Sequence, residues 1–214
     1  MPCGDLKILL ADDHSVVRSG LKEILAQGLE RAVFGEARNT QEALMLIWKE
    51  NWHVVILDIS MPGRSGLEVL REIKKSYPKL PVLVLSMHSE SQFAVRVLKH
   101  GASGYITKDS APEELVGALK KVLAGGRYVS PALAQTLAAR LSSHTRKSPQ
   151  ELLSDREHHV LCLIGSGKTV SQIARELCLN VKTISTYRAR ILEKMKMKNN
   201  AQLMRYAMDH KLVR

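Results

Sequence analysis

The chain has 214 residues, 45% of them hydrophobic, and a formal net charge of +11. This length suggests one or two domains. No apolar run is long enough to cross a membrane and no signal-peptide pattern is present, so we expect no membrane partner.

Three cysteines, Cys3, Cys162 and Cys178, form no CxxC pair. This pattern favours a reducing, cytoplasmic location over an exported disulfide scaffold. The charge is concentrated in the second part of the chain. Residues 1–125 hold 16 Lys and Arg against 15 Asp and Glu, whereas residues 126–214 hold 16 against 6. A nearly neutral part joined to a strongly basic part indicates a regulatory or catalytic module linked to a polyanion binder.

Strands and helices alternate five times in the first part of the chain. Short apolar, β-branched runs predict strands over 7–12, 32–37, 54–58, 81–86 and 104–107. Amphipathic stretches predict helices that start near Ser15, Thr40, Ser65, Ser91 and Pro112, with Ser15 and Thr40 as N-caps. This alternation is typical of a doubly wound α/β fold of the flavodoxin-like (βα)5 type, with a parallel sheet.

Polar residues stand where the predicted strands end. Asp12 and Asp13 end the first strand, and Asp58 ends the third, before a loop that Pro62 and Gly63 close. In open parallel sheets the chemistry lies just beyond the carboxyl ends of the strands. Three carboxylates brought together repel, and Mg²⁺ is a cation that binds such oxygen ligands and bridges them to phosphate.

Two further strand ends complete this set. Ser86 ends the fourth strand and can donate a hydrogen bond, and Lys108 follows the fifth strand and offers a positive charge to a phosphoryl oxygen. A carboxylate nucleophile, a metal, a lysine and a hydroxyl suit in-line phosphoryl transfer that leaves Asp58 as an acyl phosphate.

Residues 6–124 resemble the receiver domain of bacterial two-component response regulators. The resemblance is carried by LLADDH (9–14), ILDISMPG (56–63), LS (85–86) and YITKD (105–109). It implies that Asp58 is the phosphoacceptor, assisted by Lys108 and Ser86. It also implies Mg²⁺ ligands in Asp13, Asp58 and the Ser60 backbone carbonyl, with Asp12 acting through water. Ser86 and Tyr105 match the family's switch pair, in which the aromatic ring turns inward after phosphorylation.

The second part of the chain reads as helical only. Gly125 and Gly126 begin a linker over 125–149 that contains a helix over 130–142. Residues 150–213 then form an all-α domain of four short helices. Capping boxes at Ser154-x-x-Glu157 and Thr169-x-x-Gln172 open the first two helices, and Asn180 caps the third. Only three residues separate the second helix from the third, which is the spacing of a helix-turn-helix at about 170–189.

Residues 150–213 resemble the LuxR-type helix-turn-helix domain, through LSDRE (153–157), GKTVSQIARELCLNVKTIS (167–185) and ILEKM (191–195). A receiver followed by this domain is the arrangement of the NarL/FixJ family of response regulators. The resemblance implies a DNA-binding transcriptional regulator, activated when a sensor histidine kinase phosphorylates Asp58. It also implies a homodimer when active, binding to inverted repeats in double-stranded DNA, and no enzymatic activity beyond the chain's own phosphorylation and dephosphorylation.

The third helix of this domain has an apolar side and a polar side. Ile184, Ile191 and Met195 share the side that we expect to pack on the bundle. The candidate DNA contacts are Lys182, Thr183, Ser185, Thr186, Arg188, Ala189, Arg190 and Lys194. By the resemblance, Ser185, Thr186 and Ala189 hold the base-contacting positions. Because these side chains are short, we expect the four basic residues to supply much of the affinity through phosphate contacts.

Two other classes of function remain open at this point. A phosphatase that passes through an aspartyl phosphate would normally have a second Asp two residues after the nucleophile, where this chain has Ser60. A regulator controlled by a small ligand, or one that binds DNA without phosphorylation, would use the same helix-turn-helix. The charged set around Asp58 argues against a neutral ligand.

Overall fold

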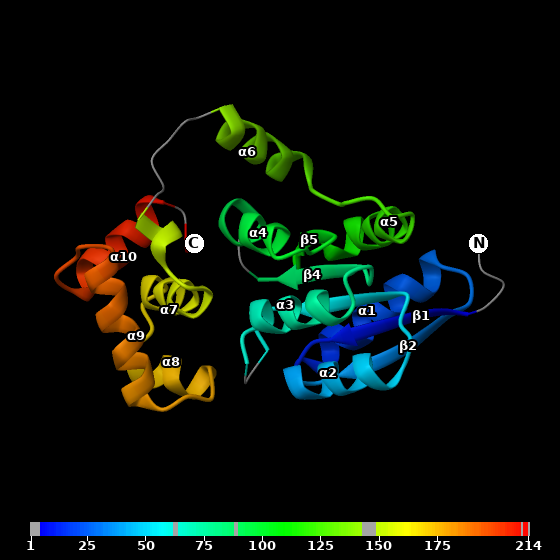
Figure 1. Ribbon diagram of the computed structural model, residues 1–214, viewed down its shortest axis with the longest axis horizontal. Coiled ribbons are helices and arrows are strands. Elements are labelled where there is room, and N and C mark those ends of the chain that lie inside the picture. The colour runs from blue at the N-terminus through cyan, green and yellow to red at the C-terminus, as the bar shows by residue number, and fades with distance from the viewer. Residues whose placement is uncertain (1–4, 62–63, 88–89, 143–148, 211, 214) are drawn as a thin grey trace. The chain divides into compact units, whose positions relative to one another are not determined.

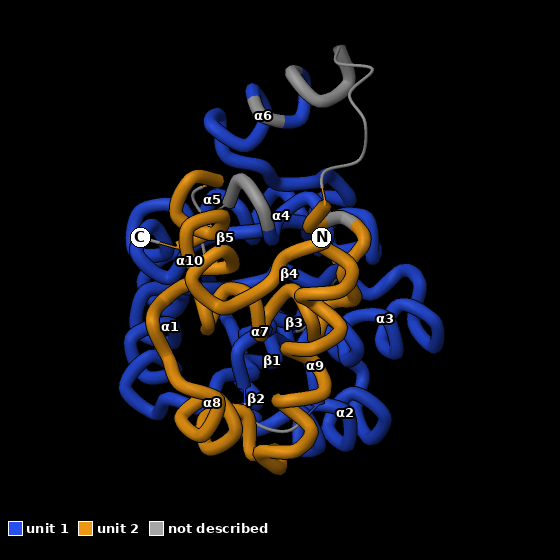
Figure 2. The backbone as a smooth tube through the Cα atoms, turned by 90° about the vertical axis from the view of Figure 1, so that its left-hand side faces the viewer, with its two compact units in different colours: residues 1–138 blue, residues 139–214 orange. Residues whose placement is uncertain are grey.

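The computed structural model (Figure 1) describes residues 5–61, 64–87, 90–142, 149–210 and 212–213. Cys3, the predicted loop closure at Pro62 and Gly63, and most of the polar stretch between 142 and 150 therefore lie outside the described residues. The chain divides into two compact units, residues 1–138 and 139–214, which Figure 2 colours separately.

Five parallel strands form one sheet in the first unit, in the order β2-β1-β3-β4-β5. They are β1 (Leu6–Ala11), β2 (Ala32–Ala37), β3 (Val54–Asp58), β4 (Val82–Ser86) and β5 (Gly104–Thr107). Every residue of β3 and β4 is buried, as expected for central strands covered on both faces. The predicted doubly wound α/β fold is confirmed, and each strand begins and ends within one residue of its prediction.

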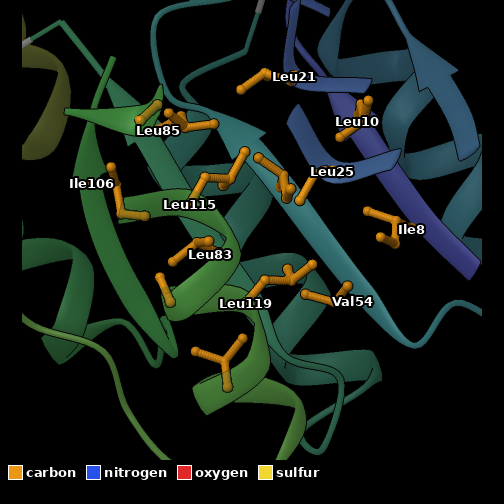
Figure 3. Close-up of a cluster of buried hydrophobic side chains, with 14 residues drawn as sticks. Ile8, Leu10, Leu21, Leu25, Val54, Leu83, Leu85, Ile106, Leu115 and Leu119 are labelled. Atoms are coloured by element: carbon orange, nitrogen blue, oxygen red, sulfur yellow. The ribbon is translucent and has the colours of Figure 1, made fainter. Parts of the chain in front are cut away.

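Helices connect the strands and cover the sheet. They are α1 (Ser15–Gly28), α2 (Thr40–Lys49), α3 (Gly66–Ser76), α4 (Glu90–Lys99) and α5 (Ala111–Leu123). Helix α1 packs beside α5, and α2 packs beside α3. Figure 3 shows Leu25 of α1 and Leu115 of α5 among the buried side chains that meet the strand residues Ile8 and Leu83. This core fixes the sheet whose strand ends carry the acidic residues.

Two predicted helix caps are wrong by one residue. Ser15 and Thr40 are the first residues of their helices, and the N-caps are His14 and Asn39. The Asn39 side chain accepts a hydrogen bond from the Glu42 N–H, while Thr40 is buried. Asparagine is a better N-cap than threonine, so Asn39 takes the position when the two are adjacent. His14 makes no side-chain cap bond.

The remaining elements are helical. They are α6 (Pro131–Ser142), the short 3-10 helix η1 (Pro149–Leu152), α7 (Asp155–Gly165), α8 (Val170–Glu176), α9 (Val181–Lys194) and α10 (Asn200–Asp209). Both predicted capping boxes are present, at Ser154 and at Thr169. Helix α7 packs against α9 and α10, and α8 packs against α9. Among the described residues, no helix combines the length and the apolar character that a membrane span requires.

Candidate functional site

The first unit has an acidic site where the strand order reverses. From β1 the sheet grows outward to β2, and from β3 it grows the other way to β4 and β5. In doubly wound sheets, ligands bind beyond the carboxyl ends of the strands at this switch point. Asp12 directly follows β1 and Asp58 is the last residue of β3, and both are buried. The strand register therefore brings the two carboxylates to one edge.

Lys108 connects these carboxylates. Its Nζ atom lies 2.6 Å from Asp12 Oδ2 and 2.6 Å from Asp58 Oδ2. The Lys108 backbone N–H donates to the Ser86 carbonyl at 2.8 Å, which extends the β4–β5 pairing and holds the lysine at the strand ends.

The backbone after Asp58 is tightly held. The Ser60 N–H donates to Asp58 Oδ1 at 2.7 Å, an Asx-type turn. A Cβ atom on Gly66, the first residue of α3, would lie 2.3 Å from the Ile59 Cα. Only glycine permits this close approach of α3 to the residue that follows Asp58.

Asp13 and His14 extend the acidic site. Asp13 Oδ1 is a buried oxygen that accepts no hydrogen bond within the described part of the chain. His14 Nδ1 lies 3.1 Å from that oxygen and 3.3 Å from Asp12 Oδ1. One donor atom from each of Asp12, Asp13, His14 and Asp58 falls within 4.8 Å of the others. A buried carboxylate oxygen that accepts no hydrogen bond in such a cluster fits a divalent cation such as Mg²⁺.

The charges at this edge are not balanced by the protein alone. Burial raises the pKa of Asp58, although Lys108 and the Ser60 N–H act in the opposite direction. Burial opposes the charged form of Lys108, but Asp58 and Asp12 outweigh it and raise the lysine pKa. The Lys108 ammonium group pairs with two carboxylates, Asp12 and Asp58, and Asp13 adds a third carboxylate nearby. The excess of negative charge is one that a divalent cation would neutralise.

The two residues of the predicted switch pair lie on the neighbouring strands β4 and β5. Ser86 is the last residue of β4 and pairs with Thr107, and Tyr105 pairs with Val84. Both side chains are fully buried. Tyr105 thus has an inward position in this structure.

Arg18 supports the acidic site and was not predicted from the sequence. It is buried, and its Nη1 donates to the Asp12 carbonyl at 2.7 Å. Its Nε donates to Glu36 on β2 at 2.9 Å, and Lys22 reaches the other oxygen of Glu36 at 2.7 Å. A basic residue on the same helix face as Leu21 is the signal that could have revealed it, because a charge there needs a partner.

The second unit contains a helix-turn-helix made by α8 and α9. The turn includes Cys178, whose φ of 51° is left-handed, and Asn180, whose side chain accepts from the Lys182 N–H at 2.7 Å. The predicted apolar side of α9 is confirmed, since Ile184, Ile191 and Met195 are buried. The opposite side is exposed and consists of Lys182, Ser185, Thr186, Ala189, Arg190 and Glu193.

Two predicted phosphate contacts on α9 have partners inside their own unit. The Arg188 Nε donates to Asn200 Oδ1 at 2.5 Å, at the start of α10. The Lys194 Nζ donates to Glu157 Oε2 at 2.6 Å, and this carboxylate is buried. Thr183 is half-buried. These bonds fix the position of α9, a role that the helix pattern alone did not reveal.

Each of the two units matches a known protein family. Residues 8–120 match the response regulator receiver domain, and residues 151–207 match the bacterial regulatory proteins of the luxR family. Response regulator GacA of Pseudomonas aeruginosa is 38% identical over 211 residues, which cover 97% of this chain and 98% of GacA.

Solved structures of similar fold agree with these matches. RcsB of Salmonella enterica serovar Typhimurium, bound to the rprA promoter with the phosphomimetic BeF3-, is 28% identical with a TM-score of 0.66. The match covers 95% of this chain and 98% of RcsB. A structure of two RcsB dimers on two parallel DNAs is also 28% identical, with a TM-score of 0.60, and covers 96% of this chain and 98% of RcsB.

Proposed function

The chain belongs to the NarL/FixJ family of two-component response regulators, and from this premise we propose that phosphorylation of Asp58 switches its activity as a DNA-binding transcriptional regulator. The observation that carries the proposal is the Lys108 ammonium group, which lies 2.6 Å from both Asp58 and Asp12 at the switch point of the sheet. The phosphoryl donor is a sensor histidine kinase, the partner of receiver domains.

The residues at the site have distinct parts in the transfer. An Asp58 carboxylate oxygen attacks the phosphorus atom while the bond from phosphorus to the donor's histidine nitrogen breaks. Asp12, Asp13, Asp58 and the Ser60 carbonyl would hold Mg²⁺, which when bound neutralises charge on the phosphoryl oxygens. Lys108 places its ammonium group against the same charge, and Ser86 donates a hydrogen bond to the phosphoryl group.

The change of state would pass through β4 and β5. Ser86 and Tyr105 are buried on the neighbouring strands β4 and β5, so a movement of Ser86 toward the phosphoryl group would be passed to the strand that carries Tyr105. A switch from 1% to 99% active requires about 5.5 kcal/mol of differential stabilisation. New hydrogen bonds from Lys108 and Ser86 to the phosphoryl group would supply this free energy.

The DNA interface would be the exposed side of α9. Ser185, Thr186 and Ala189 face outward and would meet base edges in the major groove. Lys182, Arg188, Arg190 and Lys194, with Thr183, would lie along the phosphates. Dimers of this chain would bind inverted repeats, and the RcsB dimers on DNA support this arrangement.

The test combines intact-mass spectrometry with DNA binding. Wild type and Asp58→Asn are incubated with Mg²⁺ and a small phosphodonor. One added phosphoryl group on the wild type alone, together with tighter binding to an inverted-repeat promoter, is expected. A folded wild-type protein that gains no phosphoryl group would instead indicate a constitutive or ligand-controlled DNA binder.

A further inference from the structure

We propose that His14 supplies an imidazole nitrogen to the metal site of Asp12, Asp13 and Asp58, so that this receiver also binds divalent transition-metal ions such as Ni²⁺ strongly. The inference rests on the proposed function, because it uses the same carboxylates. It adds a ligand that an oxygen-only magnesium site does not have.

The spacing of the donor atoms supports this assignment. His14 Nδ1 lies 3.1 Å from Asp13 Oδ1 and 3.3 Å from Asp12 Oδ1. Adjacent ligands of an octahedral ion with bonds of about 2.1 Å lie about 3 Å apart. The nitrogen and the two oxygens therefore already have the separation of neighbouring ligands, with Asp58 within the same 4.8 Å cluster.

One oxygen of the cluster is ready to accept a cation. Asp13 Oδ1 is buried and accepts no hydrogen bond from any described residue, and His14 Nδ1 lies 3.1 Å from it. Asp12 Oδ2, by contrast, is paired with Lys108 Nζ at 2.6 Å. Buried carboxylate oxygens normally have hydrogen-bond partners. The Asp13 oxygen is therefore the one that a metal ion bound beside His14 would satisfy.

The backbone holds His14 in place at little conformational cost. The His14 N–H donates to Asp12 Oδ1 at 2.8 Å, and Arg18 holds the Asp12 carbonyl. The imidazole is 67% exposed and makes no helix-capping bond, yet its Nδ1 faces the carboxylates. It can therefore bind a metal ion without disturbing the core.

The chemistry of the donor set defines the ion. Magnesium is bound by oxygen ligands, whereas imidazole suits nickel, zinc, iron and copper. The nitrogen should thus add affinity for Ni²⁺ and little for Mg²⁺. A plain ion pair between a protonated His14 and the two carboxylates is the competing explanation, and it predicts no metal selectivity.

The experiment titrates the full chain with Ni²⁺ and with Mg²⁺ by calorimetry, for wild type, His14→Ala and His14→Asn. We expect the Ni²⁺ affinity to fall about tenfold or more in both variants, with Mg²⁺ affinity unchanged. The second readout is the exchangeable imidazole N–H resonance that a Ni²⁺-bound histidine shows in paramagnetic proton NMR, present in wild type and absent from both variants. His210→Gln, an exposed histidine of the other unit, is the matched control and should behave as wild type.

The outcomes separate this inference from the proposed function. Unchanged Ni²⁺ affinity in the His14 variants, or an equal loss for both metals, overturns the role of His14 and leaves the magnesium site standing. A wild-type chain that binds neither metal contradicts the proposed magnesium site itself. The Asn variant keeps a polar group at the helix N-cap, so a general loss of folding cannot imitate the expected result.

Discussion

At the scale of single residues, Glu157 joins two parts of the DNA-binding unit. Its Oε2 accepts from the Ser154 N–H at 2.7 Å and from Lys194 Nζ at 2.6 Å. The carboxylate thus caps α7 and holds the end of α9. Burial opposes its charge, but the bonds from Lys194 and Ser154 outweigh burial and lower the pKa of Glu157 below its ordinary 4.5.

Glu157→Gln should lower the free energy of unfolding by about 1–2 kcal/mol at neutral pH, because a hydrogen bond to a charged group is lost while Lys194 stays partly hydrated. The folded pKa is the lower one, so this stabilisation exists above pH 4.5 and is lost as the pH falls through the folded pKa. The difference between variant and wild type should therefore shrink in acid.

Urea unfolding of the full chain, followed by far-UV circular dichroism, measures this effect. Both tryptophans, Trp48 and Trp52, lie in the first unit. The urea midpoint that tryptophan fluorescence reports should therefore be the same in the variant and in the wild type. Glu176→Gln removes the exposed pair with Lys168 and is the matched control, with an expected change within about 0.5 kcal/mol. An equal effect of both substitutions would contradict a special role for Glu157.

At the scale of elements, helix α3 is placed by one close contact with the loop after Asp58. Gly66 begins α3 against the Ile59 backbone, where a Cβ atom would have no room. Gly117 lies within α5 and has no atom within 4 Å of such a Cβ. The same substitution at these two helix positions should consequently have opposite effects.

Gly66→Ala should destabilise the first unit by about 1–3 kcal/mol, because α3 or the loop must shift. It should also slow phosphorylation, since that loop carries Ser60. Gly117→Ala should stabilise by about 1 kcal/mol, because alanine favours the helix. Tryptophan fluorescence during urea unfolding measures both, and a neutral Gly66→Ala would show that α3 can move without cost.

The sequence was sufficient to predict the helices and strands that short residue patterns define. Apolar runs such as Val54–Leu57 defined the strands, and strand ends then brought Asp12, Asp58 and Lys108 together. For the adjacent cap-forming residues Asn39 and Thr40 the prediction chose the wrong one, although the higher N-cap preference of asparagine could have ranked them.

Contacts between distant segments could not be predicted in this way. Arg18 of α1 meets Glu36 of β2, and Glu157 meets Lys194 across 37 residues. The residue pattern of each segment alone does not reveal these partners. Only the folded chain shows that their charges are paired.

At the scale of the whole molecule, the two units differ in charge. Residues 139–214 hold 15 Lys and Arg against 6 Asp and Glu, whereas residues 1–138 hold 17 against 15. Attraction to phosphates should therefore arise from the second unit, and its strength should depend on salt concentration.

Lys182→Gln should reduce the slope of log affinity against log salt by about 0.9, the value for one phosphate contact, on any duplex sequence. Lys120→Gln, an exposed lysine of α5, should leave the slope unchanged. Binding measured by fluorescence anisotropy at several salt concentrations provides the slopes. An equal reduction in both variants would mean that the two units share the interface.

The all-parallel sheet affects how fast the first unit folds. Each strand pair joins segments far apart in sequence, as when Ile8 pairs with Val54, and no hairpin is available to start the process. The second unit is built from helices that contact near neighbours along the chain. Non-local pairing slows folding and local contacts speed it. The half of the protein that the ribosome makes first is therefore expected to be the half that folds more slowly, so a newly made chain can display its DNA-binding helices before its regulatory sheet is complete.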